Sequence, residues 1–197
     1  MTSRDKILRA AQRIHDKEGL DGLSIRRVSA RVGLTPMAIY RHFADKDALL
    51  DALVADGFAE FEAYVYRAAA QETPEARVRA MFREYTTFAL DKPRLFELMF
   101  LIPRRNIPEP QDSLRTSPSP AVNQIIAALN EAMESGAIAR DDPAQVLLFA
   151  WGTIHGLIAL HFSGRFAFDD SVFTRIADAQ IDRLMRLLAG SSTPTQR

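Results

Sequence analysis

Small, aromatic and basic side chains follow one another closely between positions 35 and 46 of the chain. Tyr40, Arg41 and His42 carry groups that bond to phosphate oxygens and to the edges of bases. Residues 35–38, Thr-Pro-Met-Ala, include small side chains that permit close approach to a base pair. Lys46 follows at the first turn of the next expected helix, where an ammonium group and helix amides can hold a phosphate. These residue types suit the groove of a nucleic acid.

A short helix with one buried face is needed to present these groups, and the local sequence predicts it. Ser24 is the expected N-cap of a helix over residues 25–32, and Gly33 ends that helix. Thr35 and Pro36 begin a second helix that runs to about residue 43. The residues expected to face inward are Ile25, Val28, Val32, Ile39 and Phe43, with Leu34 filling the angle between the helices. This layout is a helix-turn-helix, although a three-helix bundle with an ordinary polar surface has the same pattern.

Charge is distributed unevenly although the formal net charge of the chain is zero. Residues 1–50 hold 10 Lys and Arg against 6 Asp and Glu, whereas residues 51–197 hold 15 against 19. A basic first part indicates contact with a polyanion, although four charges are also compatible with a solvated face.

The sequence disfavours catalytic and metal-binding functions. The 197 residues include no cysteine, which excludes disulfides, thiolate zinc sites and cysteine nucleophiles. No nucleophile elbow, phosphate-binding loop or His-Glu-x-x-His motif occurs. His155 and His161 are six residues apart on one expected helix, too far around it to share a metal. We expect no enzyme activity, no catalytic residue, no metal site and no cofactor.

The chain is expected to be cytoplasmic and to have no membrane partner. Its first residues, Met-Thr-Ser-Arg-Asp-Lys, are charged where the apolar part of a signal peptide would begin. The longest apolar run, residues 146–162, is shorter than the roughly 20 residues that a membrane span needs. We expect this run to be a deeply buried helix.

Capping residues, prolines and glycines divide the chain into about nine helices and predict an all-α fold. Residues 103–120 contain five prolines and are expected to form a long mobile loop. We expect a helix-turn-helix domain at 1–50, a helical effector-binding and dimerisation domain at 51–190, and a flexible tail at 191–197. The expected helices span residues 4–18, 25–32, 35–43, 45–70, 73–90, 91–102, 121–135, 144–163 and 169–189.

The last two helices carry a candidate dimer interface. Small residues form a narrow stripe on the helix 144–163, which suits close packing of another helix. Beside it lies a larger stripe that includes Leu148 and Trp151 and is expected to face the interior, and the final helix has a wide apolar arc. These helices are expected to pack on the same pair from a second copy, although a larger monomeric core also fits. The expected interface residues are Gly152, Gly156, Ala159, Ser163, Phe173, Ile181, Leu184 and Leu188.

Aromatic and methionine side chains are plentiful in the middle helices. They are the material of an ordinary core, and a subset of them can also line a cavity for an apolar effector with a few polar groups to orient it. The candidate lining residues are Phe82, Tyr85, Phe96, Met99, Phe100, Arg104, Trp151 and His155.

Residues 23–50 resemble the N-terminal domain of the tetracycline-repressor (TetR) family. The most specific part is Tyr40-x-His42-Phe43-x-x-Lys46-x-x-Leu49, preceded by Gly33-Leu34-Thr35. The resemblance implies that the helix 35–43 enters the major groove, with residues 35–38 nearest the bases and Tyr40, His42 and Lys46 on the backbone. Met37 stands where the family often has glycine. The expected DNA-binding residues are Ser24, Arg26, Thr35, Pro36, Met37, Ala38, Tyr40, Arg41, His42 and Lys46.

A second resemblance lies in Trp151-Gly152-x-x-His155-Gly156, which is similar to a pattern in the C-terminal domain of the WHG-type subgroup of that family. Together the resemblances imply a homodimeric repressor that a small apolar effector releases from a palindromic operator, with the helix 45–70 as a lever. Two alternatives stay open. One is a dimeric DNA-binding protein without a ligand, and the other is a helical small-molecule-binding protein or enzyme whose first domain is only structural.

Overall fold

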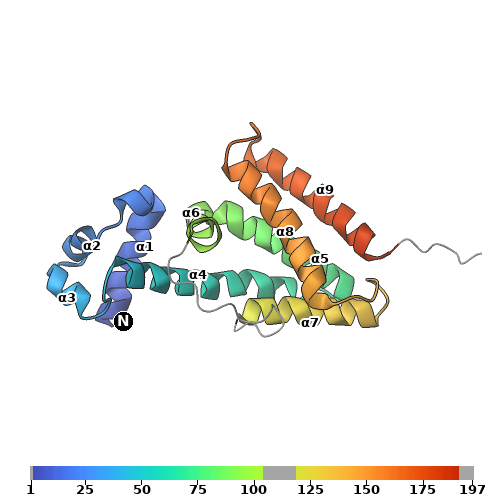
Figure 1. The fold of residues 1–197 in the computed structure, drawn as a ribbon, viewed down its shortest axis with the longest axis horizontal. Coiled ribbons are helices and arrows are strands. Elements are labelled where there is room, and N and C mark those ends of the chain that lie inside the picture. The colour runs from blue at the N-terminus through green and yellow to red at the C-terminus, as the bar shows by residue number, and fades with distance from the viewer. Residues whose placement is uncertain (1, 104–118, 191–197) are drawn as a thin grey trace, which may run out of the picture. The chain divides into compact units, whose positions relative to one another are not determined.

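A computed structural model describes residues 2–103 and 119–190. Every regular element in these residues is a helix, as the sequence predicts (Figure 1). The described residues form two compact units, one of residues 2–60 and 92–103, the other of residues 61–91 and 119–190. The predicted loop 103–120 lies outside the described residues except at its ends, residues 103, 119 and 120. The predicted tail 191–197 lies wholly outside them.

The first unit begins with α1 (Ser3–Gly22), which a reciprocal cap opens. The Asp5 amide donates to the Thr2 hydroxyl at 3.2 Å, and the Thr2 amide donates to the Asp5 carboxylate at 2.8 Å. The sequence predicts an end before Gly19, and the backbone does leave helical geometry there, with φ of 71°. The helix then resumes for one short turn to Gly22, so the predicted end is three to four residues early.

Helices α2 (Ile25–Val32) and α3 (Pro36–Tyr40) form the predicted helix-turn-helix. The turn is a Schellman motif, in which Gly33 has φ of 69° and the Leu34 amide donates to the Ser29 carbonyl at 3.0 Å. Ile39 and Phe43 are buried, as expected. The predicted inward position of Leu34 is wrong, because this side chain is 38% exposed. Its backbone closes the cap of α2 while its side chain remains outside the core.

Helix α3 is shorter than the sequence predicts and ends at Tyr40. The His42 and Phe43 amides both donate to the Ile39 carbonyl, at 2.9 and 3.0 Å, in a closing turn. Val32, also expected inward, is half-buried, whereas Ile25 and Val28 are buried. The core of the helix-turn-helix therefore rests on four of the predicted apolar residues.

Helix α4 (Lys46–Ala68) starts where predicted, since the Ala48 amide donates to the Asp45 carboxylate at 2.7 Å. Gly57 lies in its middle, against α6 (Pro93–Phe96) and the π-helix η1 (Glu97–Leu101). A Cβ at Gly57 would stand 2.7 Å from Met99 Sδ and 3.0 Å from Leu95 Cδ1. The absence of a side chain at Gly57 therefore leaves the room in which Met99 and Leu95 pack against α4. The functional division at residue 50 stays a prediction.

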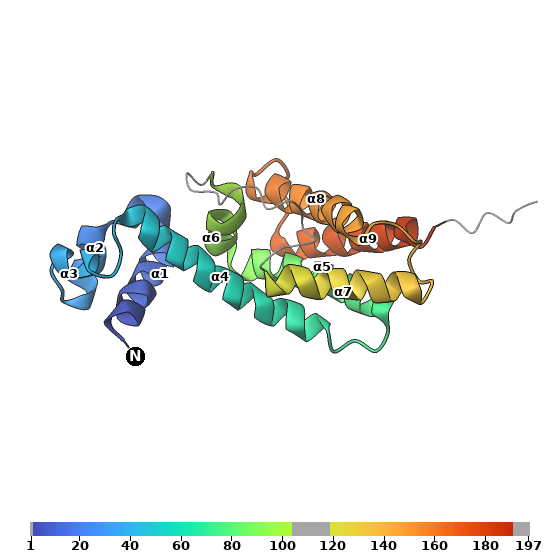
Figure 2. The ribbon, with the colours of Figure 1, turned by 60° about the horizontal axis from the view of Figure 1, so that its bottom comes forward.

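The second unit contains α5 (Pro74–Asp91), α7 (Pro120–Glu134), α8 (Pro143–Phe162) and α9 (Asp170–Leu188), which pack on one another (Figure 2). Each begins at a predicted capping residue. The amides of Ala76, Val122, Ala144 and Val172 donate to the side chains of Thr73, Ser119, Asp142 and Asp169, respectively. Arg79 and Arg83 of α5 pair with Asp182 and Asp178 of α9 around the apolar core.

Candidate nucleic-acid interface and polar cluster

The outward face of α3 presents most of the residues predicted to bind DNA. Arg41 and His42 are exposed, Met37 is 68% exposed, and Tyr40 is 47% exposed, whereas Ile39 on the opposite face is fully buried. Ile39 and Phe43 thus anchor the helix and leave the other side to solvent. Among the predicted DNA-binding residues, Arg26, Thr35, Pro36, Met37, Tyr40, Arg41 and His42 are exposed, and Ser24, Ala38 and Lys46 are half-buried.

Two predicted contacts, Ser24 and Thr35, cap the helices. The Arg27 amide donates to the Ser24 hydroxyl, and the Ala38 amide donates to the Thr35 hydroxyl, both at 3.3 Å. Their hydroxyl groups therefore act as caps that hold the N-termini of α2 and α3 in place. Side chains that position helices in this way set the orientation of neighbours such as Arg26.

Lys46 has a structural bond that the sequence did not reveal. Its Nζ donates to the Leu20 carbonyl at 3.3 Å, which ties the first turn of α4 to the end of α1. An ammonium group has three donors, so this bond is compatible with a phosphate contact and also fixes the position of Lys46.

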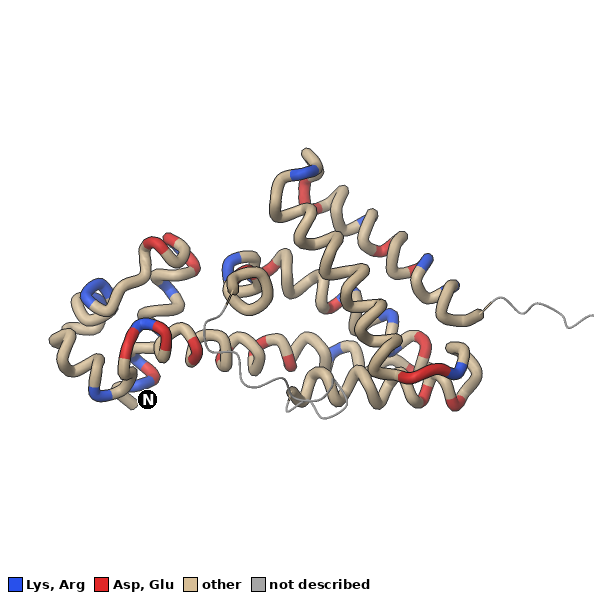
Figure 3. Tube along the Cα trace, viewed as in Figure 1, with Lys and Arg blue, Asp and Glu red and all other residues tan. Residues whose placement is uncertain are grey.

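Basic residues surround α3 in the sequence and on the surface. Residues 24–46 contain five Lys and Arg and one acidic residue, Asp45. Arg27 forms an ion pair with Glu18 at 2.6 Å and donates a hydrogen bond to the Gly22 carbonyl at 2.8 Å. Arg26 and Arg31 are exposed. Figure 3 shows the blue segments on α2. The result is an apolar and aromatic strip within a basic surface.

In the second unit, three predicted effector-binding residues meet in a polar cluster. The Tyr85 hydroxyl lies 2.9 Å from Trp151 Nε1 and 2.8 Å from His155 Nδ1. Trp151 Nε1–H can only donate, so the tyrosine oxygen accepts from it, while the oxygen also lies within hydrogen-bond distance of His155 Nδ1. We call Tyr85, Trp151 and His155 the Tyr–Trp–His cluster.

Burial shifts the pKa of two of these groups toward the neutral form. Tyr85 is almost fully buried on α5, and desolvation raises the pKa of its hydroxyl far above the ordinary value. His155 is half-buried on α8, and desolvation lowers its pKa below the ordinary value of 6.5. The cluster is therefore an uncharged hydrogen-bonding group at neutral pH.

The other predicted effector-binding residues are distributed differently. Phe82 is buried on α5 in the second unit. Phe96, Met99 and Phe100 belong to the first unit. There the ring of Phe100 packs edge-to-face against that of Phe58 of α4, with the ring centroids 5.7 Å apart. Arg104 lies outside the described residues. The structure assembles only the polar part of the predicted site, and the apolar lining stays a prediction.

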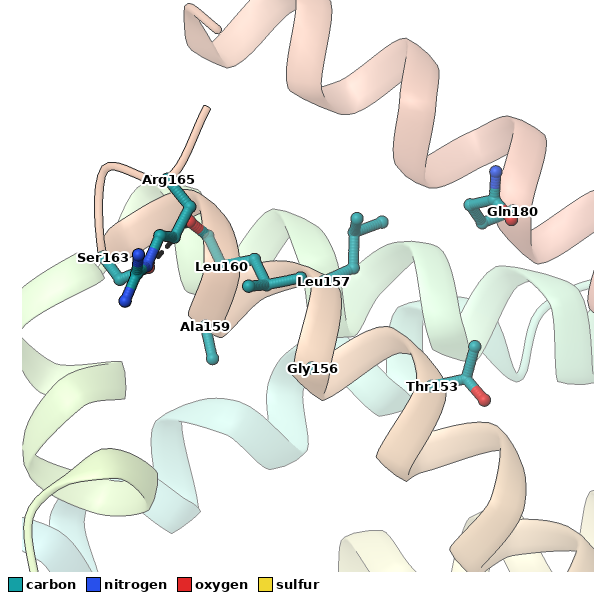
Figure 4. A pocket seen from close by; sticks show the side chains of 8 residues that line it. All are labelled: Thr153, Gly156, Leu157, Ala159, Leu160, Ser163, Arg165 and Gln180. Carbon is teal, nitrogen blue, oxygen red and sulfur yellow. Dashed lines mark hydrogen bonds between the residues drawn. The ribbon is translucent and has the colours of Figure 1, made fainter. Parts of the chain in front are cut away.

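A largely apolar groove of the second unit lies elsewhere, along α8 (Figure 4). The predicted stripe of small residues contributes Gly156, Ala159 and Ser163 to it. None of the predicted effector-binding residues lines this groove. The lining residues are Thr153, Gly156, Leu157, Ala159, Leu160, Ser163, Arg165 and Gln180.

The predicted dimer interface needs correction on α9. Phe173, Ile181 and Leu184 are buried within the protomer, so the prediction that they face a second copy is wrong. They belong to the core that α9 shares with the other helices of its unit. Gly152 and Ser163 are exposed, and Gly156, Ala159 and Leu188 are half-buried, so these five keep some access to solvent.

The expectation that residues 146–162 are deeply buried is also wrong for one side of α8. Ala150, Ile154 and Ile158 are buried, but Leu148, Phe149 and Leu160 are exposed, and Leu148 was expected to face the interior. In the described part of the chain, α8 is the one helix long and apolar enough to cross a membrane, and 33% of that stretch is buried. Length and composition alone do not separate such a span from a helix with a packing surface.

Two family models match the chain. Residues 7–53 match bacterial regulatory proteins of the tetR family, and residues 78–184, more than half of the chain, match the tetracyclin repressor-like C-terminal domain. The first match contains the helix-turn-helix, and the second contains the Tyr–Trp–His cluster. The two models together cover both compact units in large part.

Individual relatives agree with these models. The HTH-type transcriptional repressor DrrR1 of Streptomyces coeruleorubidus is 46% identical over 50 residues, which are 25% of this chain and 18% of DrrR1. The class A tetracycline repressor of transposon 1721 from Escherichia coli is 43% identical over 54 residues, 27% of this chain and 25% of that repressor. The chain thus matches a quarter or less of the length of these curated relatives.

A solved structure extends the similarity to nearly the whole chain. A protein of unknown function from Rhodococcus sp. RHA1 superposes with a TM-score of 0.74 at 27% identity, over 96% of this chain and 97% of that one.

Proposed function

The chain belongs to the TetR family of DNA-binding transcriptional regulators, and from this premise we propose that it is a repressor that a small apolar effector releases from a palindromic operator. The observation that carries the proposal is the exposed outer face of α3, with Tyr40, Arg41 and His42 beside the basic residues of α2. The protein works in the cytoplasm as a homodimer, and its operator half-sites match its two-fold symmetry.

DNA binding divides into two kinds of contact. Tyr40, His42 and Lys46 hold the phosphate backbone and position the protein, while residues 35–38 lie against the bases. The exposure of Tyr40 and His42 and the fixed position of Lys46 support this division. Binding is expected to weaken steeply as salt concentration rises, because basic side chains displace condensed counterions.

The first experiment measures binding of the full chain to fragments of its own genome. Replacing both Tyr40 and Arg41 by alanine should weaken all binding by about tenfold or more. A matched control replaces exposed Tyr66 and Arg140 by alanine and should bind as the native chain does. Unchanged affinity in the first variant would refute the assignment of α3 to the groove.

A second copy of the chain is proposed to cover the exposed apolar side of α8. Leu148, Phe149 and Leu160 lie on the surface of a helix that contains no Lys, Arg, Asp or Glu. Small residues beside them permit close approach of another helix, as the groove in Figure 4 supports. Phe149→Glu should shift sedimentation from dimer toward monomer, whereas the control Asn130→Glu, at an exposed position of α7, should not. A monomeric native chain at micromolar concentration would rule out the interface.

Effector control is proposed to act through the second unit. Polar groups of a bound molecule that reach the Tyr–Trp–His cluster compete for its hydrogen bonds and shift the position of α5 relative to α8. To release the operator, the effector must bind the DNA-free state more tightly than the DNA-bound state, because equal affinity for the two states would change nothing. Compounds found by thermal shift should lower the affinity of the protein for its operator. Tyr85→Phe should change the concentration of compound that is needed for this effect.

A dimeric DNA-binding protein without an effector is the second candidate. One observation favours it: within the protomer, the Tyr85 hydroxyl already forms hydrogen bonds to Trp151 Nε1 and to His155 Nδ1. A broad thermal-shift screen without any stabilising compound, together with intact operator binding, would support this candidate over the first.

A further inference from the structure

Met37 is the most exposed large apolar side chain in the described part of the protein, at 68%. It shares the outer face of α3 with Tyr40, three residues later, and the exposed Leu34 precedes it by three residues. Ile39 and Phe43, which hold α3 from the opposite side, are buried. The core of the protein therefore does not use Met37, and its apolar surface is available to a partner.

The surroundings of Met37 indicate what kind of partner that is. Arg26, Arg31 and Arg41 are exposed on α2 and directly after α3. A surface that combines an apolar centre with basic neighbours complements a polyanion that also carries apolar groups. Double-stranded DNA has that combination in its major groove, where phosphates flank the 5-methyl groups of thymine.

The residues closest to the bases lack the usual groups for reading bases by hydrogen bonds. Such recognition relies on Arg or Lys for guanine, Asn or Gln for adenine, and Asp or Glu for cytosine. Residues 35–38 contain none of these, and the Thr35 hydroxyl accepts the Ala38 amide as a helix cap. The remaining major-groove signal that apolar side chains recognise is the thymine methyl group.

We propose that Met37 packs on the 5-methyl group of a thymine in each operator half-site, so that this base pair is selected by apolar contact. The proposal rests on the function proposed above and adds the chemistry of base selection to it. The thioether chain is flexible and fills gaps well, which suits contact with a methyl group.

The test removes single methyl groups from DNA. An operator is first isolated with the full native chain from genomic fragments, and each thymine is then replaced by deoxyuridine, which lacks only the methyl group. At one position per half-site, this change should weaken native binding about fourfold, and about sixteenfold when both half-sites are changed. For Met37→Ala the same replacement should have no effect, because the contact is already lost.

Each result separates the two proposals. Failure of the native chain to bind any fragment would refute the repressor function itself. Binding that tolerates every deoxyuridine would overturn the thymine contact and leave the function in place. An equal loss for the native chain and Met37→Ala would assign the methyl contact to another residue and also overturn the proposal. Unchanged operator affinity in Met37→Ala would overturn the proposal as well, because the contact would then contribute nothing to binding.

Because Met37 is exposed, its variants should fold. Circular dichroism and thermal melting should match those of the native chain. Met37→Gln adds a second readout, since an amide at this position favours adenine. Selection with this variant should replace the thymine preference by an adenine preference at the same position.

Discussion

Replacing Tyr85 by phenylalanine removes one hydroxyl group from the Tyr–Trp–His cluster and leaves the ring in place. The hydroxyl makes hydrogen bonds to Trp151 Nε1 at 2.9 Å and to His155 Nδ1 at 2.8 Å. Its ring packs edge-on against Phe61 at 5.6 Å, and the substitution preserves that contact. The change in stability therefore reports the two hydrogen bonds.

The expected loss is about 2 kcal/mol, about 1 kcal/mol for each hydrogen bond. Trp151 and His155 are half-buried, so water reaches them in part and keeps the loss near the lower end of the range for such groups. For a chain of this length, the loss corresponds to a melting temperature lower by about 4–8 °C. The control Tyr66→Phe makes the same chemical change at an exposed position and should cost less than about 0.5 kcal/mol.

Trp151 is the only tryptophan in the chain, so its fluorescence reports on the cluster directly. Unfolding in urea is followed by fluorescence and by circular dichroism at one fixed protein concentration, since dimerisation would change the apparent stability. Tyr85→Phe should lower the midpoint in both signals. Equal midpoints for Tyr85→Phe and Tyr66→Phe would refute the claim that the cluster stabilises the second unit.

Two further predictions concern a close contact and a titration. Gly57→Leu should destabilise the protein by about 2 kcal/mol, because overpacking against Met99 outweighs a gain of about 0.8 kcal/mol in helix propensity. The control is Ala59→Leu, at an exposed position of the same helix. Equal melting temperatures for the two variants would contradict the close contact at Gly57. The pKa of His155 is lowered by burial, so its contribution to stability is complete above its ordinary pKa of 6.5 and is lost as the pH falls toward the lower folded pKa. Melting at about pH 7.5 and about pH 5.5 should show this loss in the native chain and a smaller loss in His155→Gln, and identical losses would disprove it.

The helices were predictable because the signals that start them are local. Thr73, Asp142 and Asp169 each accept a backbone amide within the next three residues, so the sequence alone contains both partners. The helix-turn-helix was predictable for the same reason. Its cap, its glycine turn and its buried Ile39 lie within twenty residues of one another.

Facing directions were less predictable where a helix is apolar on all sides. Leu147, Leu148 and Phe149 are consecutive and chemically similar, and the first is buried while the other two are exposed. No charged residue on α8 fixes the rotation of the helix, so the pattern alone does not show which side packs inward. The predicted apolar arc of α9 is largely buried, but Phe173 and Ile181 are buried by their own protomer and not by a second copy. Periodicity shows that a side chain is buried and does not identify the element that buries it.

The exposed apolar residues of α3 and α8 are thus proposed to meet different partners, and their neighbouring side chains distinguish the two surfaces. Met37 stands among exposed arginines, and a purely apolar partner would leave those charges desolvated without compensation. Phe149 stands on a helix without any charged residue, next to residues as small as Gly152, and α8 itself offers no cation to the phosphates of a nucleic acid. Under the two proposals, the same hydrophobic effect directs α3 toward a charged duplex with methyl groups and α8 toward the uncharged α8 of a second copy.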